Sequence, residues 1–277
     1  TFSRNWDPWL YDHRLKELQS VLKQAGDSSV LAPYYRFGLK KSGLAKNPWI
    51  KLESKYTTIG IKRHFPRYNK LVDEFIDDLT SFSFKAAWTG QELGEKPEVW
   101  FSRKTNNQKL AEHLSRFYRK IAAGVCEKNG AQFFADDNTW NTLYFASIRE
   151  ILPEAKLVHI YRDPRDVVAS FMQQTWAPTN PVEAAHFYAG IMDEWFRVRE
   201  NLPDDSYLEA SLEELVTDTR QTLQRILDHW NLPWDEQVME MDLSKSHSGR
   251  WENEISQDKY ADVYNILKVY LKKLGYE

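Results

Sequence analysis

A short apolar run that leads directly into a helix constrains the fold of this chain more than any other feature. Residues 156–161 (KLVHIY) predict a buried strand. Only Arg162 and Asp163 separate this strand from Pro164, which suits the first position of a helix predicted over residues 164–174. A strand that passes so abruptly into a helix is typical of a sheet that is covered by helices.

The rest of the second half continues this alternation. Residues 206–210 predict a second strand, which is preceded and followed by helical periodicity. Strands that alternate with helices predict the α/β class, with a parallel sheet flanked by helices. The other helices predicted in this half cover residues 140–152, 181–200, 217–230 and 257–274.

The first half of the chain has a different pattern, with helical periodicity and few strand signals. We expect a mostly helical region over residues 1–130 and a core over residues 131–277. Both would belong to one domain, because 277 residues fit a single large domain. The helices predicted in the first region cover residues 8–25, 68–80 and 107–127, and residues 27–66 and 81–106 are predicted to be irregular.

Composition argues against several classes of protein. The 37 basic and 40 acidic residues give a net charge of −3, which argues against a nucleic-acid binder. The single cysteine, Cys126, cannot form an intrachain disulfide, and no cluster has metal-ligand spacing, so no metal is expected. The chain lacks an apolar run of about 18 residues that would span a membrane. Its low cysteine content suits a reducing compartment, and we expect a cytoplasmic location.

Glycine spacing excludes the common nucleotide-binding loops. None of the 11 glycines forms a GxG pair, so a dinucleotide-binding fingerprint is absent. Residues 38–43 (GLKKSG) come nearest to a Walker loop, but Leu44 and Ala45 stand where that motif needs lysine and serine or threonine. Phosphate binding in this chain would therefore need another group of residues.

The strand-to-helix junction is the best candidate for that role. In an open α/β sheet, ligands bind beyond the carboxyl ends of the strands, and a helix N-terminus favours anions. Arg162 lies at the junction, Arg165 lies in the first helical turn, and the Ser170 hydroxyl lies two turns into the helix. The alternative is that Asp163 and Asp166 simply pair with these arginines on a solvated helix end.

The order strand–Arg-Asp-Pro-Arg-Asp-x-x-x-Ser resembles the 3′-phosphate-binding motif of sulfotransferases that use 3′-phosphoadenosine 5′-phosphosulfate (PAPS). The resemblance implies that Arg162 and Ser170 hold the 3′-phosphate. Residues 246–251 (SHSGRW) are similar to the C-terminal loop of the family, whose Gly-Arg pair would be Gly249 and Arg250. Residues 134–141 and 207–216 also resemble family segments, and the likeness covers about half of the chain.

The resemblance implies an α/β fold of the P-loop kinase-like sulfotransferase type. Residues 131–277 would form the nucleotide-binding core, and residues 1–130 would form a variable region on the acceptor side. PAPS would donate a sulfuryl group to a hydroxyl or amine of a small-molecule or carbohydrate acceptor. Arg165 is a further candidate for binding the donor.

This sequence departs from the family at two places. The loop that binds the sulfate side of the donor is not found. Lys41-Ser-Gly43 repeats three of its letters, and we expect the first strand and its loop to lie before Thr1. Asp137 stands where the family often has lysine.

The general base is an open question at this stage. Asp137 or Asp136 is a candidate, although either could instead cap the helix predicted at residue 140. His64 is a further candidate, with an exposed loop histidine as the alternative. These departures keep a second function open, in which a non-catalytic sulfotransferase-like protein binds a nucleotide or a protein partner.

Overall fold

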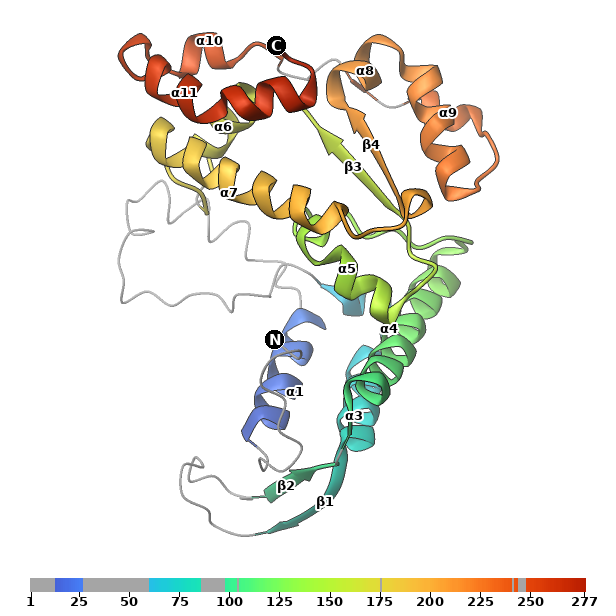
Figure 1. The fold of residues 1–277 in the computed structure, drawn as a ribbon. Helices are drawn as coiled ribbons and strands as arrows, with labels where there is room; N and C mark the ends of the chain where they lie inside the picture. Colours follow the sequence, from blue (N-terminus) through green and yellow to red (C-terminus); the bar gives the residue numbers. More distant parts are fainter. Residues whose placement is uncertain are drawn as a thin grey trace, which may run out of the picture. The chain divides into compact units, whose positions relative to one another are not determined.

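The computed structural model describes residues 13–26, 60–85, 98–103, 105–174, 176–240, 242–243 and 248–277 (Figure 1). The chain divides into two compact units, Thr1–Asp136 and Asp137–Glu277, which we call the N-terminal and C-terminal units. Their boundary lies close to the predicted change at residue 130, and the single-domain organisation stays a prediction. The segment around Lys41 and the start of the helix predicted over residues 8–25 lie outside the described residues.

The N-terminal unit packs its helices around a core of aliphatic and aromatic side chains. Its helices are α1 (His13–Gly26), the 3₁₀ turn η2 (Ile61–Arg63), α3 (Tyr68–Leu79) and α4 (Asn107–Asn129). The Phe75 and Phe117 rings stack with centroids 4.5 Å apart, between α3 and α4. Asn106 caps α4 by accepting a hydrogen bond from Lys109 N at 2.9 Å, and Gly130 ends it with φ +63°.

An antiparallel hairpin in the N-terminal unit corrects the expectation of an irregular segment over residues 81–106. Its strands are β1 (Thr80–Lys85) and β2 (Glu98–Ser102). Serine and phenylalanine alternate along β1, which places Phe82 and Phe84 on one face of the strand. The Phe82 ring stacks on Phe101 of β2 at 4.7 Å. These cross-strand aromatic contacts stabilise the pairing of the two strands.

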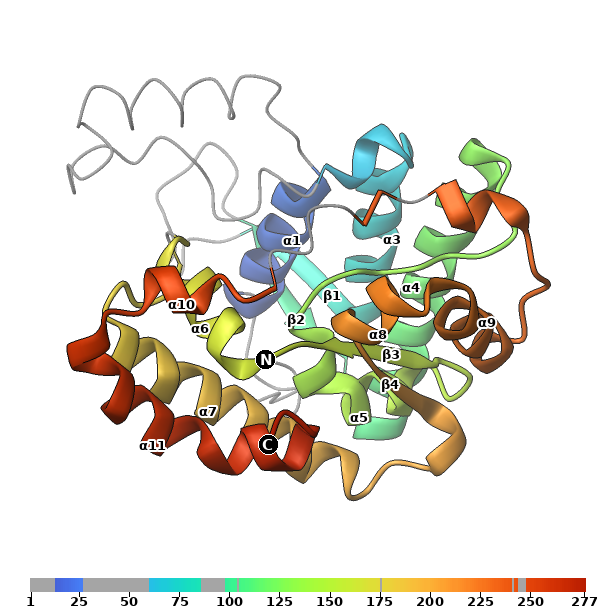
Figure 2. The same ribbon diagram turned by 90° about the horizontal axis from the view of Figure 1, so that it is seen from above.

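The C-terminal unit contains the predicted parallel strand pair. Strands β3 (Leu157–Tyr161) and β4 (Tyr207–Ser211) pair in register from Leu157↔Tyr207 to Tyr161↔Ser211. Helices α7 (Pro181–Arg199) and α11 (Gln257–Leu274) lie alongside each other (Figure 2). Their shared core contains Trp195 and Leu267. The remaining helices and turns are α5 (Asn141–Ile151), α6 (Pro164–Met172), η3 (Asp204–Ser206), α8 (Leu212–Thr217), α9 (Thr219–Trp230), η4 (Glu236–Glu240) and α10 (Trp251–Glu254).

Local sequence signals account for most of the helix ends. Pro164 and Pro181 occupy the first turns of α6 and α7, where a missing N–H costs nothing. Ser211 and Glu214 form a reciprocal capping box that starts the short α8, which was not predicted, because the predicted helix began only at residue 217. Gly275 ends α11 with φ +82°.

The parallel sheet flanked by helices is confirmed only in part. The described residues give two strands in this sheet, and Ile160 on one face of β3 keeps 42% of its surface exposed. Residues 134 and 135, which begin a segment that resembles one of the family, form no strand and are exposed. Helix α5 begins at Trp140 without a side-chain cap. Instead, Asn138 Oδ1 accepts a hydrogen bond from Trp140 N at 3.1 Å.

Candidate functional site

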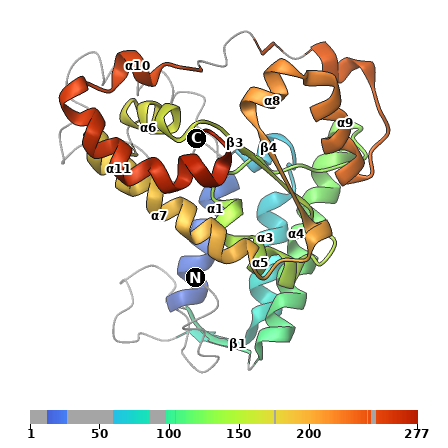
Figure 3. The ribbon, with the colours of Figure 1, turned by 45° about the horizontal axis from the view of Figure 1, so that its top comes forward.

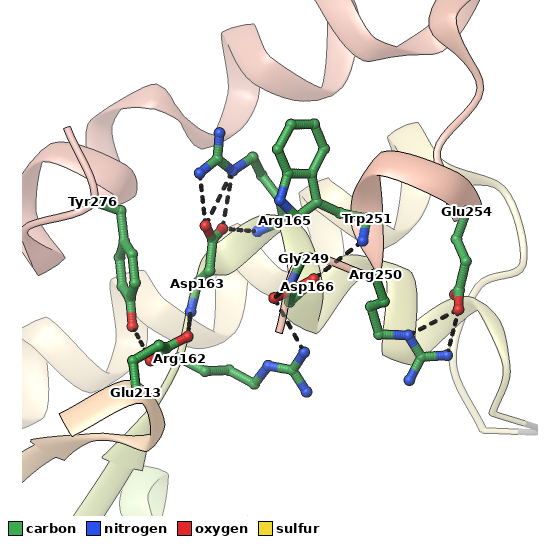
Figure 4. A network of polar contacts seen from close by, with 10 residues as sticks. All are labelled: Arg162, Asp163, Arg165, Asp166, Glu213, Gly249, Arg250, Trp251, Glu254 and Tyr276. Carbon is green, nitrogen blue, oxygen red and sulfur yellow. Dashed lines mark hydrogen bonds and ion pairs between the residues drawn. The ribbon is translucent and has the colours of Figure 1, made fainter. Parts of the chain in front are cut away.

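The junction between β3 and α6 is organised by two buried carboxylates, Asp163 and Asp166 (Figure 4). Asp163 caps α6, because its Oδ1 accepts a hydrogen bond from Arg165 N at 2.8 Å. It also binds the Arg165 side chain, with Nη2 2.6 Å from Oδ2. The predicted aspartate–arginine pairing is therefore present, but the two carboxylates are buried instead of solvated.

Asp166 joins the junction to a distant part of the sequence. Its Oδ2 accepts a hydrogen bond from Gly249 N at 2.8 Å, and its Oδ1 accepts one from Trp251 N at 3.1 Å. Arg162 Nη2 lies 3.4 Å from Oδ2 of the same carboxylate. Figure 3 shows α6, α10 and α11 gathered at one end of the C-terminal unit, where these groups lie. Predicted site residues from two segments are thus brought together.

Arg165 and Arg250 are each held by a partner within the site. The Arg165 guanidinium lies 4.3 Å from the centre of the Trp251 ring, a cation–π contact. Its hydrogen bond to Asp163 is the main cause of a raised pKa for Arg165, so the side chain stays charged. Arg250 binds Glu254 Oε1 through Nε at 2.9 Å and Nη2 at 2.7 Å. Arg165 therefore helps to hold the Trp251 ring in place. Its role in binding the donor stays a prediction.

The last residues of the chain also reach this junction. Tyr276 donates a hydrogen bond to Glu213 Oε2 at 2.5 Å, and Glu213 Oε1 accepts one from Asp163 N at 3.1 Å. Burial first, and then the bond to Glu213, raise the pKa of the Tyr276 hydroxyl. The first turn of α8 and the residues that follow α11 thereby hold the carboxyl end of β3 in place.

The site can bind a ligand through hydrogen-bond donors, because its positive charges are balanced by carboxylates. Figure 4 shows three arginines among four carboxylates, so the cluster has no surplus of basic groups. A guanidinium has five N–H donors, and within the described residues Arg250 binds Glu254 through Nε and Nη2, so its Nη1 group can serve a ligand. Among the described residues, the Ser170 hydroxyl has no protein partner, and it lies one turn beyond Asp166 on the same face of α6. Donors arranged in this way, beside a helix N-terminus, suit a phosphate.

Comparisons with known proteins agree with this chemistry. A family model for the sulfotransferase family matches residues 56–236. The chain belongs to the sulfotransferase family. This confirms the family expected from the motif at residues 162–170.

The individual proteins that match this chain are distant from it in sequence. A solved sulfotransferase domain from the curacin biosynthetic pathway shares the fold, with a TM-score of 0.50 and 13% identity over 82% of each chain. An uncharacterized protein of Aquifex aeolicus (strain VF5) is 22% identical over 162 residues, which cover 54% of this chain and 20% of that protein. The match thus spans about a fifth of that relative's length.

The three predicted catalytic residues lie apart from the junction in the sequence. His64 follows η2 in the N-terminal unit and is exposed. Asp136 ends that unit and interacts with Tyr118, whose pKa rises to about 12, first through burial and then through the charge of Asp136. Asp137 begins the C-terminal unit and is exposed. Neither aspartate caps α5, and the catalytic roles of all three residues stay predictions.

Several residues of the junction were not predicted from the sequence as site residues. Trp251, Glu213 and Tyr276 act through contacts with residues far away in the chain, and Asp166 was considered only as a partner of an arginine. One signal for the role of Asp166 was present in the sequence, because this residue stands four residues after Arg162, a spacing at which two side chains can pair.

In the part of the chain that the structure describes, we find no group of three metal-ligating side chains and no helix long and apolar enough to cross a membrane.

A second polar cluster lies between the sheet and α7. Glu209 of β4 accepts hydrogen bonds from His159 Nδ1 at 3.1 Å and from the buried Trp195 Nε1 at 2.8 Å, and it pairs with Arg199. Burial alone would raise the pKa of Glu209, but these hydrogen bonds and the charge of Arg199 lower it below its ordinary value. This cluster ties the middle of both strands to α7.

Proposed function

We propose that this protein transfers a sulfuryl group from PAPS to a hydroxyl or amine of a small-molecule or carbohydrate acceptor. The family and the fold support sulfotransfer in general terms. PAPS is the proposed donor because Arg162, Ser170, Gly249 and Arg250 match the family segments for its 3′-phosphate. We also propose that strands β3 and β4 belong to a sheet of the P-loop kinase-like type.

One observation carries the proposal. Arg162 at the end of β3 and the Gly249–Trp251 turn meet on a single carboxylate, Asp166, although 83 residues separate it from Gly249. The two segments that the family uses for one phosphate are thus in contact in this chain.

The residues at the junction fit a phosphate dianion. Arg162 and Arg250 are partly exposed and supply guanidinium donors, and the Ser170 hydroxyl and the α6 N-terminus add donors on the same side of α6. When bound, PAPS supplies the activated sulfuryl group. These protein groups would bind the 3′-phosphate and so orient the nucleotide.

The acceptor must lose a proton when its oxygen or nitrogen takes up the sulfuryl group, so a base is required. We propose Asp137 or Asp136 for this role, with His64 as the third candidate. Asp137 and His64 are exposed, and a solute can reach them. Replacing the true base should lower kcat by about 100-fold or more and leave nucleotide affinity unchanged.

Isothermal titration with adenosine 3′,5′-bisphosphate tests the donor site. Arg162→Ala should weaken binding by about 10- to 100-fold, because a charge-assisted contact to the 3′-phosphate is lost. Arg197→Ala is the matched control, since Arg197 is an exposed arginine that pairs with Glu194 on α7. Absence of binding to the unmodified protein, or equal affinity in Arg162→Ala, would sink the proposal.

A transfer assay separates the two functions that the sequence left open. Radiolabelled PAPS is incubated with pooled carbohydrate, phenol and alcohol acceptors, and labelled products are counted. Binding of the bisphosphate without any labelled product would favour the non-catalytic alternative, which the aspartate at position 137 motivates.

A further inference from the structure

We infer that Asp166 is the positioning residue that assembles the 3′-phosphate pocket from its two halves. The inference rests on the proposed function and goes beyond it, because Asp166 itself would touch no substrate. It would act on Arg162 in one segment and on the backbone around Arg250 in the other.

The contacts of Asp166 are unusual for a carboxylate in the first turn of a helix. The residue is only 1% exposed, although most aspartates at such positions face water. Both of its oxygens accept backbone N–H groups, from Gly249 at 2.8 Å and from Trp251 at 3.1 Å. Arg162 supplies the compensating positive charge at 3.4 Å. A buried carboxylate with three such partners is satisfied, so it stays in one place.

The two backbone donors are the residues on either side of Arg250. Fixing the N–H groups of Gly249 and Trp251 therefore fixes the direction in which the Arg250 side chain leaves the backbone. Gly249 has φ +80°, a conformation that other residues rarely adopt, which lets the turn present both N–H groups to one carboxylate. Through Asp166, the positions of Arg250 and Arg162 become linked.

The sign of the effect distinguishes positioning from simple electrostatics. A carboxylate next to a phosphate pocket repels the ligand, so removing its charge alone would tighten binding of a 3′-phosphate. If Asp166 positions both halves of the pocket, removing its charge must weaken that binding instead. If Asp166 only stabilises the fold, all nucleotides must lose affinity together.

Asp166→Asn provides the test, because asparagine keeps the shape of the side chain. Its amide has one acceptor oxygen, so it cannot accept both backbone N–H groups and cannot balance the charge of Arg162. The affinities for adenosine 3′,5′-bisphosphate and adenosine 5′-monophosphate are measured by isothermal titration, together with the melting temperature. Asp258→Asn is the control, since Asp258 is an exposed acidic residue in the first turn of α11 of the same unit.

We expect Asp166→Asn to weaken binding of the bisphosphate by about 10- to 100-fold and to change binding of the monophosphate less than about threefold. The control should keep both affinities. Tighter or unchanged bisphosphate binding, or an equal loss for both nucleotides, overturns the positioning role. If the unmodified protein does not prefer the bisphosphate, the 3′-phosphate site itself is wrong, and both proposals fail.

Asp166→Ser keeps the test decisive if the asparagine variant does not fold. Serine is tolerated near a helix N-terminus, is smaller than aspartate and carries no charge. The same loss of preference for the 3′-phosphate is expected, and an unchanged preference overturns the inference.

Discussion

Replacing Glu209 with glutamine removes a charge from the cluster between the sheet and α7 and keeps the shape of the side chain. The carboxylate accepts hydrogen bonds from His159 and Trp195 and pairs with Arg199. His159 and Trp195 share Oε1, whereas Arg199 pairs with Oε2, so a glutamine that keeps its oxygen toward the first two residues turns its NH₂ group to Arg199. The opposite orientation would leave the N–H of the buried Trp195 side chain without an acceptor, and that N–H cannot turn to water.

The cost follows from these contacts. A hydrogen bond to a charged group contributes about 1.5–3 kcal/mol, and neighbouring bonds are not additive. Glu209 and Arg199 keep part of their side chains exposed, so solvent screens their attraction. We therefore expect Glu209→Gln to lower the free energy of unfolding of the C-terminal unit by about 2–3 kcal/mol. At roughly 3–5 °C per kcal/mol, Tm should fall by about 6–15 °C.

The pH dependence has a definite sign. Because the pKa of Glu209 is lower in the folded protein, its contribution is complete above the pKa of the unfolded chain and is lost as pH falls through the folded pKa. A protonated glutamate then resembles glutamine. The difference in Tm between the protein and Glu209→Gln should be full at pH 7 and should shrink below about pH 4.5.

Thermal unfolding followed by circular dichroism from pH 7 to pH 3 makes this measurement. Glu194→Gln is the matched control, because Glu194 is an exposed carboxylate that pairs with Arg197 within α7. Its Tm should stay close to that of the unmodified protein. Equal melting of the protein and Glu209→Gln at pH 7, or a difference that does not diminish down to pH 3, would refute the reasoning.

Three further substitutions test the packing of the C-terminal unit. Tyr276→Phe removes the hydrogen bond to Glu213 and should cost about 1 kcal/mol in urea unfolding; no loss would mean that this bond adds nothing. Arg165→Ala removes the cation–π contact with Trp251 and a buried ion pair, and should lower stability by about 2–4 kcal/mol and change tryptophan fluorescence. Leu267→Ala empties a fully buried site between α11 and α7 and should cost about 2–5 kcal/mol by calorimetry, whereas a change below 1 kcal/mol would contradict the described core.

The longer helices of the C-terminal unit, but not the short helices α8 and α10, were predicted within a few residues. Their signals are local, such as Pro164 and Pro181 at helix starts and Gly275 at a helix end. Each of these residues restricts its own backbone, so no distant contact is needed to interpret it. Strand β3 was also predicted from a local signal, because its short apolar run ends directly before the start of a helix.

Features that depend on distant contacts were missed. The residues between β1 and β2 are too many for the short hairpin motifs that a sequence reveals, so the pairing of Phe82 with Phe101 left no local signal. The role of Asp166 depends on two backbone N–H groups, and a sequence does not reveal which carboxylate they meet. Arg162 was a candidate from its place between a strand and a helix, whereas Gly249 was predicted only from the family resemblance.

The long sequence separation within the junction bears on the order of folding. Asp166 meets Gly249 and Trp251 across 83 and 85 residues. Contacts of such separation require a large loop to close first, which costs chain entropy, so they form slowly. During refolding we therefore expect the helical signal to recover before nucleotide affinity, and a bound nucleotide would report the last step of assembly.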